Sequence, residues 1–209
     1  PTGCLEAQSF TSGLRPDGTS PFSQDGICIH RGLGVAGFSE LTIVPDAGVV
    51  KLDPDIPLDI ACVIGCAVQT GVGAVFNSAR VEVGSTVFVT GLGGIGISIV
   101  QGARIAGAGK IIVSDPVAER REAAIHFGAT YTINPDEDEV IPKVLEETKA
   151  IGVDYAFEAA GVASLVDTCI NASRIGGTTV IVGADASLST VQILPVLIAT
   201  MGKKIIGSL

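Results

Sequence analysis

TVFVTGLGGIG, residues 86–96, is the stretch that decides the fold of this chain. Its first five residues form a short β-branched run, which predicts a buried strand over Thr86–Thr90. The glycines that follow have the spacing G-x-G-x-x-G, and a helix-like segment continues from Gly94 to Ala106. The pattern therefore predicts a strand, a tight glycine turn and a helix in direct succession, the context in which such a loop receives a diphosphate.

The glycines of this loop have separate tasks. Gly91 permits the tight turn out of the strand, Gly93 lacks a side chain where a pyrophosphate must approach, and Gly96 lets the helix pack close to the sheet. The free N–H groups and the positive end of the helix then face the phosphates. The candidate cofactor-binding residues of the loop are Gly91, Leu92, Gly93, Gly94, Ile95 and Gly96.

The alternation of strand and helix continues outward from this loop to the end of the chain. Such alternation implies right-handed crossovers and a parallel sheet that is covered on both faces. We therefore expect a doubly wound, six-stranded parallel α/β sheet of the Rossmann type. Besides the first strand, the predicted strands cover residues 110–114, 130–133, 153–157, 178–182 and 203–206. The predicted helices between them cover residues 94–106, 118–127, 137–149, 164–172 and 191–201.

An acidic residue stands where the second of these strands ends. Asp115 comes about 20 residues after the last motif glycine, where such folds place a carboxylate that binds the adenosine ribose. Because a carboxylate there would repel the 2′-phosphate of NADP, the sequence predicts NAD. Arg120, one helical turn further on, could reach the same ribose or a phosphate, could shift the preference slightly toward NADP, or could lie on a solvated helix face.

Small residues follow the fourth and fifth predicted strands. In open α/β sheets the ligand lies beyond the carboxyl ends of the strands, where small residues let a nicotinamide and its ribose approach the backbone. Such residues are also ordinary loop starts, and the two interpretations are compatible. The candidate residues are Ala159, Ala160, Gly161, Val182, Gly183 and Ala184.

The first part of the chain has a different character. Residues 1 to about 60 are irregular and rich in turn-forming residues, with short β-like runs at 38–44 and 48–52. We expect residues 1–67 to be the end of a mainly β domain and residues 68–209 to be the dinucleotide-binding domain. The chain does not begin with Met, so we also expect it to be an excerpt of a longer protein.

Composition and charge exclude several classes of protein. Hydrophobic residues make up 47% and charged residues 17%, which is a globular and not a disordered composition. The net charge of −9 and the scattered basic residues argue against a nucleic-acid partner. No apolar run is long enough to span a bilayer, so no membrane partner is expected. Five cysteines at irregular spacing indicate reduced thiols in a cytoplasmic protein and no disulfide framework.

The segment around Cys66 extends the interpretation of the cysteines. From spacing alone, Cys62 and Cys66 share a helical face, and because two cysteines cannot complete a tetrahedral zinc site they are expected to be core residues. The segment IGCAVQTGVGA at 64–74, followed by EVGST at 82–86 and the glycine loop, resembles the zinc-dependent medium-chain alcohol dehydrogenases. The likeness is strongest to the branch of class III and benzyl alcohol dehydrogenases, and it continues to the end of the chain.

This resemblance implies a site and a reaction. Cys66 matches a ligand of the catalytic zinc, whose other protein ligands, a Cys and a His, would precede Pro1. Thr70 matches a position beside the nicotinamide, and Cys4 resembles the last of four cysteines that bind a structural zinc. The implied reaction is the oxidation of an alcohol to an aldehyde or ketone, and the reverse, by hydride transfer with NAD at a catalytic zinc. The preceding β domain would be GroES-like. Cys28 and Cys169 match no ligand and are predicted to be packing residues.

The resemblance also implies an assembly. The apolar segment 191–206 would help to join subunits, so a homodimer or homotetramer is expected. The excerpt alone is expected to bind NAD weakly without turnover, because it would hold only part of each zinc-ligand set.

Two alternatives stay open. One is a zinc-free, NADPH-dependent quinone or enone reductase of the same superfamily, which generally lacks residues like Cys66 and Asp115. The other is a non-catalytic, dinucleotide-binding sensor. The particular alcohol or aldehyde substrate is left open among primary alcohols, benzyl-type alcohols and thiol adducts of formaldehyde.

Overall fold

The computed structural model divides the chain into two compact units. The first unit spans Pro1–Ile56 and the second spans Pro57–Leu209. The described residues are 12–15, 17–32, 35, 37–44, 46–184 and 189–209.

The first unit contains one antiparallel hairpin. Strands β1 (Phe22–Gln24) and β2 (Ile27–Ile29) pair across a turn in which Asp25 and Gly26 both have positive φ, the geometry of a tight two-residue hairpin turn. A single 3₁₀ turn, η2 (Asp46–Gly48), follows. The β-like runs expected at 38–44 and 48–52 form no strand in the described part of this unit, because a strand needs a partner to satisfy its backbone.

The second unit begins with one apolar helix of 22 residues, Leu58–Ala79. It consists of α2 (Leu58–Ala61), α3 (Gln69–Gly73) and two π-helical segments, η3 (Ile64–Val68) and η4 (Ala74–Ala79). The predicted division between residues 67 and 68 falls inside this helix, whereas the compact unit begins at Pro57. The assignment of the first part to a GroES-like domain stays a prediction.

By length and composition alone, the helix Leu58–Ala79 could cross a membrane. The expectation that no apolar run has this length was wrong, because glycines read as interruptions lie inside the helix. Its later half packs within the unit: Ala74 and Val75 are fully buried, and a Cβ at Gly71 would lie 2.5 Å from the Cβ of Ser98. This packing assigns the half to the protein core, since membrane-spanning helices present such residues to lipid or to other spans.

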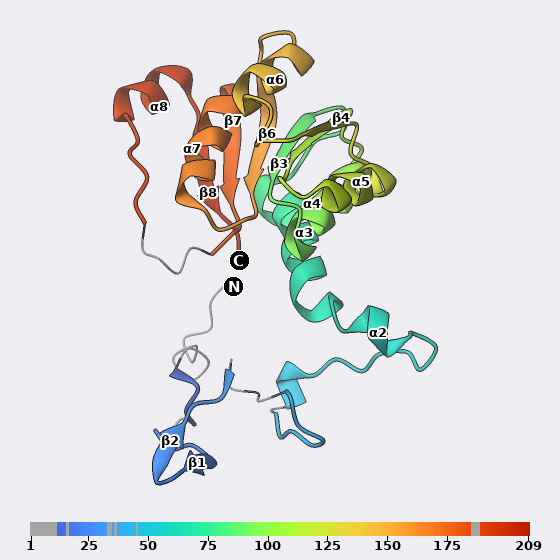
Figure 1. The fold of residues 1–209 in the computed structure, drawn as a ribbon, viewed down its shortest axis with the longest axis vertical. Helices are drawn as coiled ribbons and strands as arrows, with labels where there is room; N and C mark the ends of the chain where they lie inside the picture. The colour runs from blue at the N-terminus through green and yellow to red at the C-terminus, as the bar shows by residue number, and fades with distance from the viewer. Residues whose placement is uncertain (1–11, 16, 33–34, 36, 45, 185–188) are drawn as a thin grey trace. The chain divides into compact units, whose positions relative to one another are not determined.

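The rest of the second unit is a six-stranded sheet in the order β5-β4-β3-β6-β7-β8, with every neighbouring pair parallel. This order is that of two mononucleotide-binding halves that diverge from the central strands β3 and β6. The predicted doubly wound sheet is therefore confirmed (Figure 1). The strands are β3 (Thr86–Thr90), β4 (Lys110–Ser114), β5 (Tyr131–Ile133), β6 (Val153–Glu158), β7 (Ser173–Ile181) and β8 (Lys204–Gly207).

Five helices follow in alternation with these strands, as predicted. Helix α8 starts later than expected because Pro195 occupies its first turn, where a missing N–H costs nothing. Strand β7 starts earlier than expected, and its pairing with β6 shifts register between Val153 and Tyr155. The helices are α4 (Gly94–Ile105), α5 (Ala118–Phe127), α6 (Val140–Glu147), α7 (Ala163–Ala172) and α8 (Pro195–Met201).

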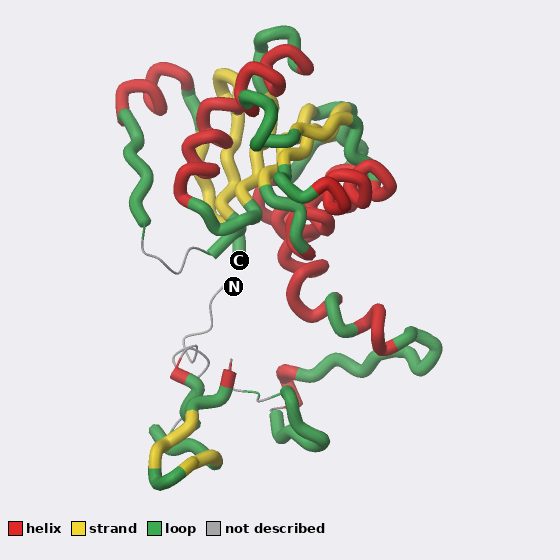
Figure 2. Tube along the Cα trace, viewed as in Figure 1, coloured by secondary structure: helices red, strands yellow, loops and turns green. Residues whose placement is uncertain are grey.

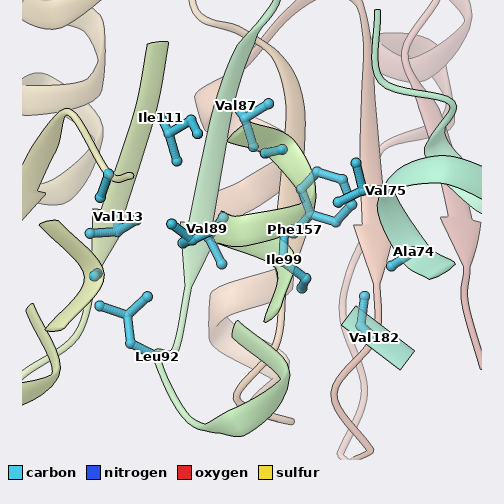
Figure 3. Close-up of a cluster of buried hydrophobic side chains, with 14 of the residues drawn as sticks. Ala74, Val75, Val87, Val89, Leu92, Ile99, Ile111, Val113, Phe157 and Val182 are labelled. Carbon is cyan, nitrogen blue, oxygen red and sulfur yellow. The ribbon is translucent and has the colours of Figure 1, made fainter. Parts of the chain in front are cut away.

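The sheet has a hydrophobic core on each face, because successive side chains of a strand point to opposite sides. Val87 and Val89 of β3 pack with Ile99 of α4 and Phe157 of β6, as Figure 3 shows. Phe88, between the two valines, packs on the other face in a cluster with residues of α6 and α7. Figure 2 shows the strands lying between the two helical layers. The carboxyl ends of the strands are thereby left as the edge at which a ligand can bind.

Candidate functional site

A cavity of about 390 Å³ opens at the carboxyl ends of the central strands. It lies where the strand order reverses, between the halves that start at β3 and β6, which is the ligand position of open α/β sheets. Six of the predicted cofactor-binding residues share it. Its lining is Thr90, Gly91, Gly93, Ser114, Asp115, Pro116, Arg120, Pro135, Ala159, Ala160, Val162 and Leu165.

The glycine loop of this cavity has the geometry that the sequence predicts. Gly91 has φ +83°, and a Cβ there would lie 2.8 Å from the Cβ of Ala160. A Cβ at Gly96 would lie 1.9 Å from the carbonyl oxygen of Gly91, so only glycine allows the helix to start so close to the turn. A Cβ at Gly93, in contrast, would meet no atom of the described residues within 4 Å, its chain neighbours aside. Protein packing therefore leaves the space at Gly93 open to a ligand.

Helix α4 presents an uncapped N-terminus to the loop. Its N-cap residue is Gly93, no side chain caps the helix, and its first turn contains no acidic residue. The first backbone N–H groups of an α-helix have no partner inside the helix, and they form its positive end. The start of α4 can therefore receive the negative charge of a phosphate.

Asp115 links the second strand of the sheet to the glycine loop. Its carboxylate is almost completely buried: Oδ2 accepts the N–H of Leu92 at 2.8 Å and Oδ1 accepts the N–H of Val117 at 2.9 Å. The guanidinium of Arg120 lies 3.6 Å from Oδ2 on a half-exposed side chain, and Arg121 donates to the Asp115 carbonyl oxygen. Because a carboxylate can accept about four hydrogen bonds, each oxygen keeps capacity for a ribose hydroxyl.

The same hydrogen bond changes the role expected of Leu92. Its N–H donates to Asp115 instead of facing a phosphate, and its side chain is 2% exposed in the core. Leu92 therefore shapes the loop and offers no donor to a ligand in this structure. Leu92, predicted as a cofactor-binding residue, is therefore not among the free N–H donors of the loop in this structure.

Glu158 is a residue that the sequence did not single out as a site residue. It ends β6 and is 1% exposed, and its Oε1 accepts the N–H groups of Ala160, Gly161 and Val162 at 2.8, 2.8 and 3.3 Å. Its main-chain oxygen accepts the N–H groups of Val182 and Gly183. The available signal was a charged residue that closes an apolar strand directly before two alanines and a glycine.

The remaining predicted strand-end residues lie around Glu158. Gly161 and Gly183 line a second cavity, of about 210 Å³, together with Glu158. Val182 is buried and Ala184 is exposed, and a Cβ at Gly161 would lie 2.7 Å from the carbonyl oxygen of Ala184. The turns after β6 and β7 are therefore in direct contact.

Cys66 and Thr70 lie on the helix Leu58–Ala79, with Cys66 exposed in the π-helical segment η3 and Thr70 partly buried in α3. This helix packs on the start of α4, since a Cβ at Gly94 would lie 3.0 Å from the Cβ of Ala67. The residue next to Cys66 thus contacts the first residue of the helix that carries the glycine loop.

A zinc site can be tested against the donors that the structure brings together. Within the described ranges no group of three or more His, Cys, Asp or Glu side chains is placed to hold a metal. Cys66 is suitable as one exposed thiol donor, but a tetrahedral site needs further ligands. Cys4, the predicted ligand of a structural zinc, lies outside the described residues.

The other cysteines differ in burial. Cys169 is fully buried, and this burial, aided by the charge of Glu158, raises the pKa of its thiol to about 12. Its predicted packing role is confirmed. Cys28 is exposed in β2, so the same prediction was wrong for Cys28 within the described part of its unit.

Comparison with known proteins gives one consistent family of relatives. Residues 94–209 match the zinc-binding dehydrogenase family. The chain is 39% identical over 198 residues to an S-(hydroxymethyl)glutathione dehydrogenase of Synechocystis sp., covering 94% of this chain and 53% of the relative. It is 41% identical over 200 residues to an alcohol dehydrogenase class-3 of Zea mays, covering 95% and 52%. The chain thus spans about half the length of the curated relatives it matches.

Solved structures give the same result. An alcohol dehydrogenase zinc-binding domain protein from Burkholderia ambifaria superposes with a TM-score of 0.89 at 32% identity, over 98% of this chain and 56% of the other. The benzyl alcohol dehydrogenase of Acinetobacter calcoaceticus superposes with a TM-score of 0.85 at 29% identity, over 93% and 52%. A zinc-binding dehydrogenase from Sinorhizobium meliloti 1021, solved bound to NADP, has a TM-score of 0.65 at 33% identity, over 69% and 43%.

Proposed function

This chain belongs to the zinc-binding dehydrogenase family. From that premise we propose that it binds NAD across the carboxyl edge of its six-stranded sheet and is the cofactor-binding part of an alcohol dehydrogenase. The observation that carries the proposal is the open space at Gly93. Apart from its chain neighbours, no atom of the described residues lies within 4 Å of a Cβ built there, directly in front of the uncapped start of α4. A diphosphate is the ligand that this combination of space and backbone N–H groups suits.

We assign the two ends of the proposed cofactor from the strand order. Asp115 directly follows β4, on the side of β3 that binds the adenosine half in doubly wound folds, and the turns after β6 and β7 would hold the nicotinamide half. Ala159, Ala160 and the start of α4 lie between the two. NAD bound in this way crosses the centre of the sheet.

We propose NAD and not NADP as the preferred cofactor. The Asp115 carboxylate is fixed by the N–H groups of Leu92 and Val117, so it cannot turn away from a 2′-phosphate without breaking both hydrogen bonds. Arg120, 3.6 Å from Oδ2, offsets part of that negative charge. A relative solved with NADP makes this preference a matter for direct measurement.

The proposed reaction is the oxidation of an alcohol to an aldehyde or ketone. The carbinol carbon gives a hydride, with both electrons of its C–H bond, to NAD⁺ to form NADH, and the alcohol hydroxyl loses its proton. The part of this chain is to bind and orient the nicotinamide, with Thr70 beside the ring, and to supply the Cys66 thiol as one ligand of a zinc ion. Zinc, when bound, would supply Lewis-acid polarisation of the alcohol oxygen.

The relatives indicate which alcohols to try first. Those compared above are named for S-(hydroxymethyl)glutathione, for class-3 alcohol dehydrogenase and for benzyl alcohol. We propose a small primary or benzyl-type alcohol, or a thiol adduct of formaldehyde, as the substrate class.

We also propose that the protein forms a homodimer or homotetramer. Strand β8 is an edge strand of the sheet, and Leu194 and Val196, at the start of α8, are about two-thirds exposed. A second copy that pairs with β8 across a two-fold axis would extend the sheet and cover these apolar side chains. Light scattering that gives the mass of a single chain would count against this assembly.

The primary experiment is a titration of the purified chain with NAD and with NADP, in which calorimetry measures the binding. Saturable binding of NAD, tighter than that of NADP, is expected. The same protein should form no NADH from alcohol until the zinc ligands are complete. No binding of either dinucleotide to a folded sample would overturn the proposal, and tighter binding of NADPH with reduction of a quinone or enone would favour the zinc-free alternative.

A further inference from the structure

The two oxygens of the buried Glu158 carboxylate differ in their hydrogen bonds. Oε1 accepts three backbone N–H groups, whereas Oε2 is buried and has no hydrogen-bond partner among the described residues. Nor does any described lysine, arginine or histidine form an ion pair with it. Leaving a charged oxygen unpaired in the interior costs free energy. A glutamine could accept from the same three N–H groups without burying a charge, at the smaller cost of an unpaired amide NH₂.

The open oxygen faces the contact between the two turns on the nicotinamide side of the sheet. A Cβ at Gly183 would lie 2.6 Å from Oε2 and 2.1 Å from the nitrogen of Gly161, so glycine is required for the turns to close around the carboxylate. The adjoining cavity of about 210 Å³ is otherwise lined largely by apolar side chains, among them Val166, Ile181 and Val191. Such surroundings screen a charge weakly.

Glu158 is also mechanically connected to the glycine loop. Ala160, whose N–H is bound by Oε1, occupies the space that a side chain at Gly91 would need. Ala159 donates its N–H to the carbonyl oxygen of Thr90. The carboxylate therefore lies at the meeting point of the turns that end β3, β6 and β7.

We propose that the negative charge of Glu158 favours the oxidised cofactor, whose nicotinamide ring is cationic, over the neutral ring of NADH. The inference rests on the proposed binding of NAD with its nicotinamide half at the turns after β6 and β7. A fixed carboxylate in an apolar surrounding attracts a nearby cation and is indifferent to the neutral ring. Its effect is thus on the ratio of the two dissociation constants, which a purely structural residue would leave unchanged.

The test compares Glu158→Gln with the exposed Glu122→Gln of helix α5 as a matched control. Dissociation constants for NADH are measured by the fluorescence of the cofactor, and those for NAD⁺ and AMP by calorimetry. In E158Q the affinity for NAD⁺ relative to that for NADH is expected to fall by roughly tenfold, about 1.4 kcal/mol, which corresponds to one charge interaction across about 12 Å at an effective dielectric of about 20. AMP affinity should stay as in the parent chain, and E122Q should match the parent in all three ligands.

A second variant, Glu158→Asp, keeps the charge and shortens the side chain. It is expected to retain the preference for NAD⁺ even where both affinities fall. An unchanged ratio in a folded E158Q protein overturns the inference, as does a lost ratio in E158D. Failure of E158Q to fold also counts against it, because the charge would then be required by the fold. If the parent chain binds neither nucleotide, the proposed function itself is wrong.

Discussion

The carboxylate oxygen Oδ2 of Asp115 accepts the backbone N–H of Leu92 at 2.8 Å, across 23 positions of sequence. The bond joins the end of β4 to the turn between β3 and α4. The residue proposed to bind the ribose thus also holds the loop proposed to bind the diphosphate. Damage to either element is expected to affect the other, and the first prediction uses this coupling.

Replacing Asp115 by alanine should weaken both the fold and the cofactor site. The N–H groups of Leu92 and Val117 lose their acceptor, which is expected to lower the free energy of unfolding by about 1–3 kcal/mol. NAD affinity should fall by at least about tenfold, and the preference over NADP should disappear. Urea unfolding and cofactor titrations check both, with the exposed Asp136→Ala as a surface control. An undiminished preference for NAD would contradict the assigned role.

Alanine at Gly93 should weaken NAD binding with little change in stability, whereas alanine at Gly96 should lower the stability of the fold. G93A places a methyl group in open space at an extended backbone, so stability should change by less than about 0.5 kcal/mol. NAD affinity should nevertheless drop by at least about tenfold, because the methyl group fills the place of the diphosphate. G96A drives a methyl group toward the Gly91 carbonyl oxygen and should cost about 1–3 kcal/mol or more of stability. Thermal melting with NAD titration separates the two, and a G93A protein that binds NAD normally would refute the proposed position of the phosphates.

The alkaline stability of the chain should depend on Cys169. Burial raises the pKa of its thiol from the ordinary value of 9.0 to about 12. Below pH 9 both states keep the proton, whereas between pH 9 and about 12 the unfolded chain releases it and the folded chain does not. Between pH 9 and about 12, deprotonation of Cys169 therefore favours the unfolded chain. The free energy of unfolding falls by at most about 1.4 kcal/mol per pH unit.

Urea unfolding between pH 8 and pH 10.5, roughly the range in which the thiol of an unfolded chain titrates, measures this loss. The parent chain should lose stability more steeply than Cys169→Ala. Burial also raises the pKa of Tyr155, in the same direction, and this contribution is common to both proteins and cancels in the difference. Equal slopes in the two proteins would show that the thiol does not titrate as described.

Cys66 should separate cofactor binding from turnover. Its exposed thiol lies outside both cavities at the sheet edge, so Cys66→Ala should leave NAD affinity within about twofold of the parent. In the zinc-loaded enzyme that contains this chain, the same change, or treatment with a chelator, should abolish NADH formation from alcohol. Absorbance at the NADH band is the readout, with Cys62→Ala as the control. Full activity of the C66A enzyme would remove Cys66 from the proposed zinc site.

Local patterns in the sequence were sufficient to predict the sheet and the glycine loop. All six strands of the sheet were expected because each is a short apolar run between turn residues, and the loop because three glycines follow a strand. The early start of β7 and the register shift beside Val153 could not be expected, since they depend on pairing between strands.

The site was predictable only where one residue type serves one task. Gly91 and Gly96 have such tasks in the packing of the loop, and the structure places both as expected. Asp115 lines the same cavity, and its role toward the ribose stays a prediction. The bond from Leu92 to Asp115 and the three N–H groups on Glu158 are tertiary contacts, which spacing does not encode. The sequence predicted a division between residues 67 and 68, whereas the compact units divide at Pro57, where the helix Leu58–Ala79 begins.

Because Gly94 has no side chain, the helix of Cys66 can pack through Ala67 directly against the first turn of α4. A methyl group at residue 94 would push the two helices apart and move the Cys66 thiol away from the glycine loop. In the proposed enzyme, larger and larger side chains at residue 94 are therefore expected to increase the distance between the alcohol and the nicotinamide, and to lower the rate of hydride transfer step by step.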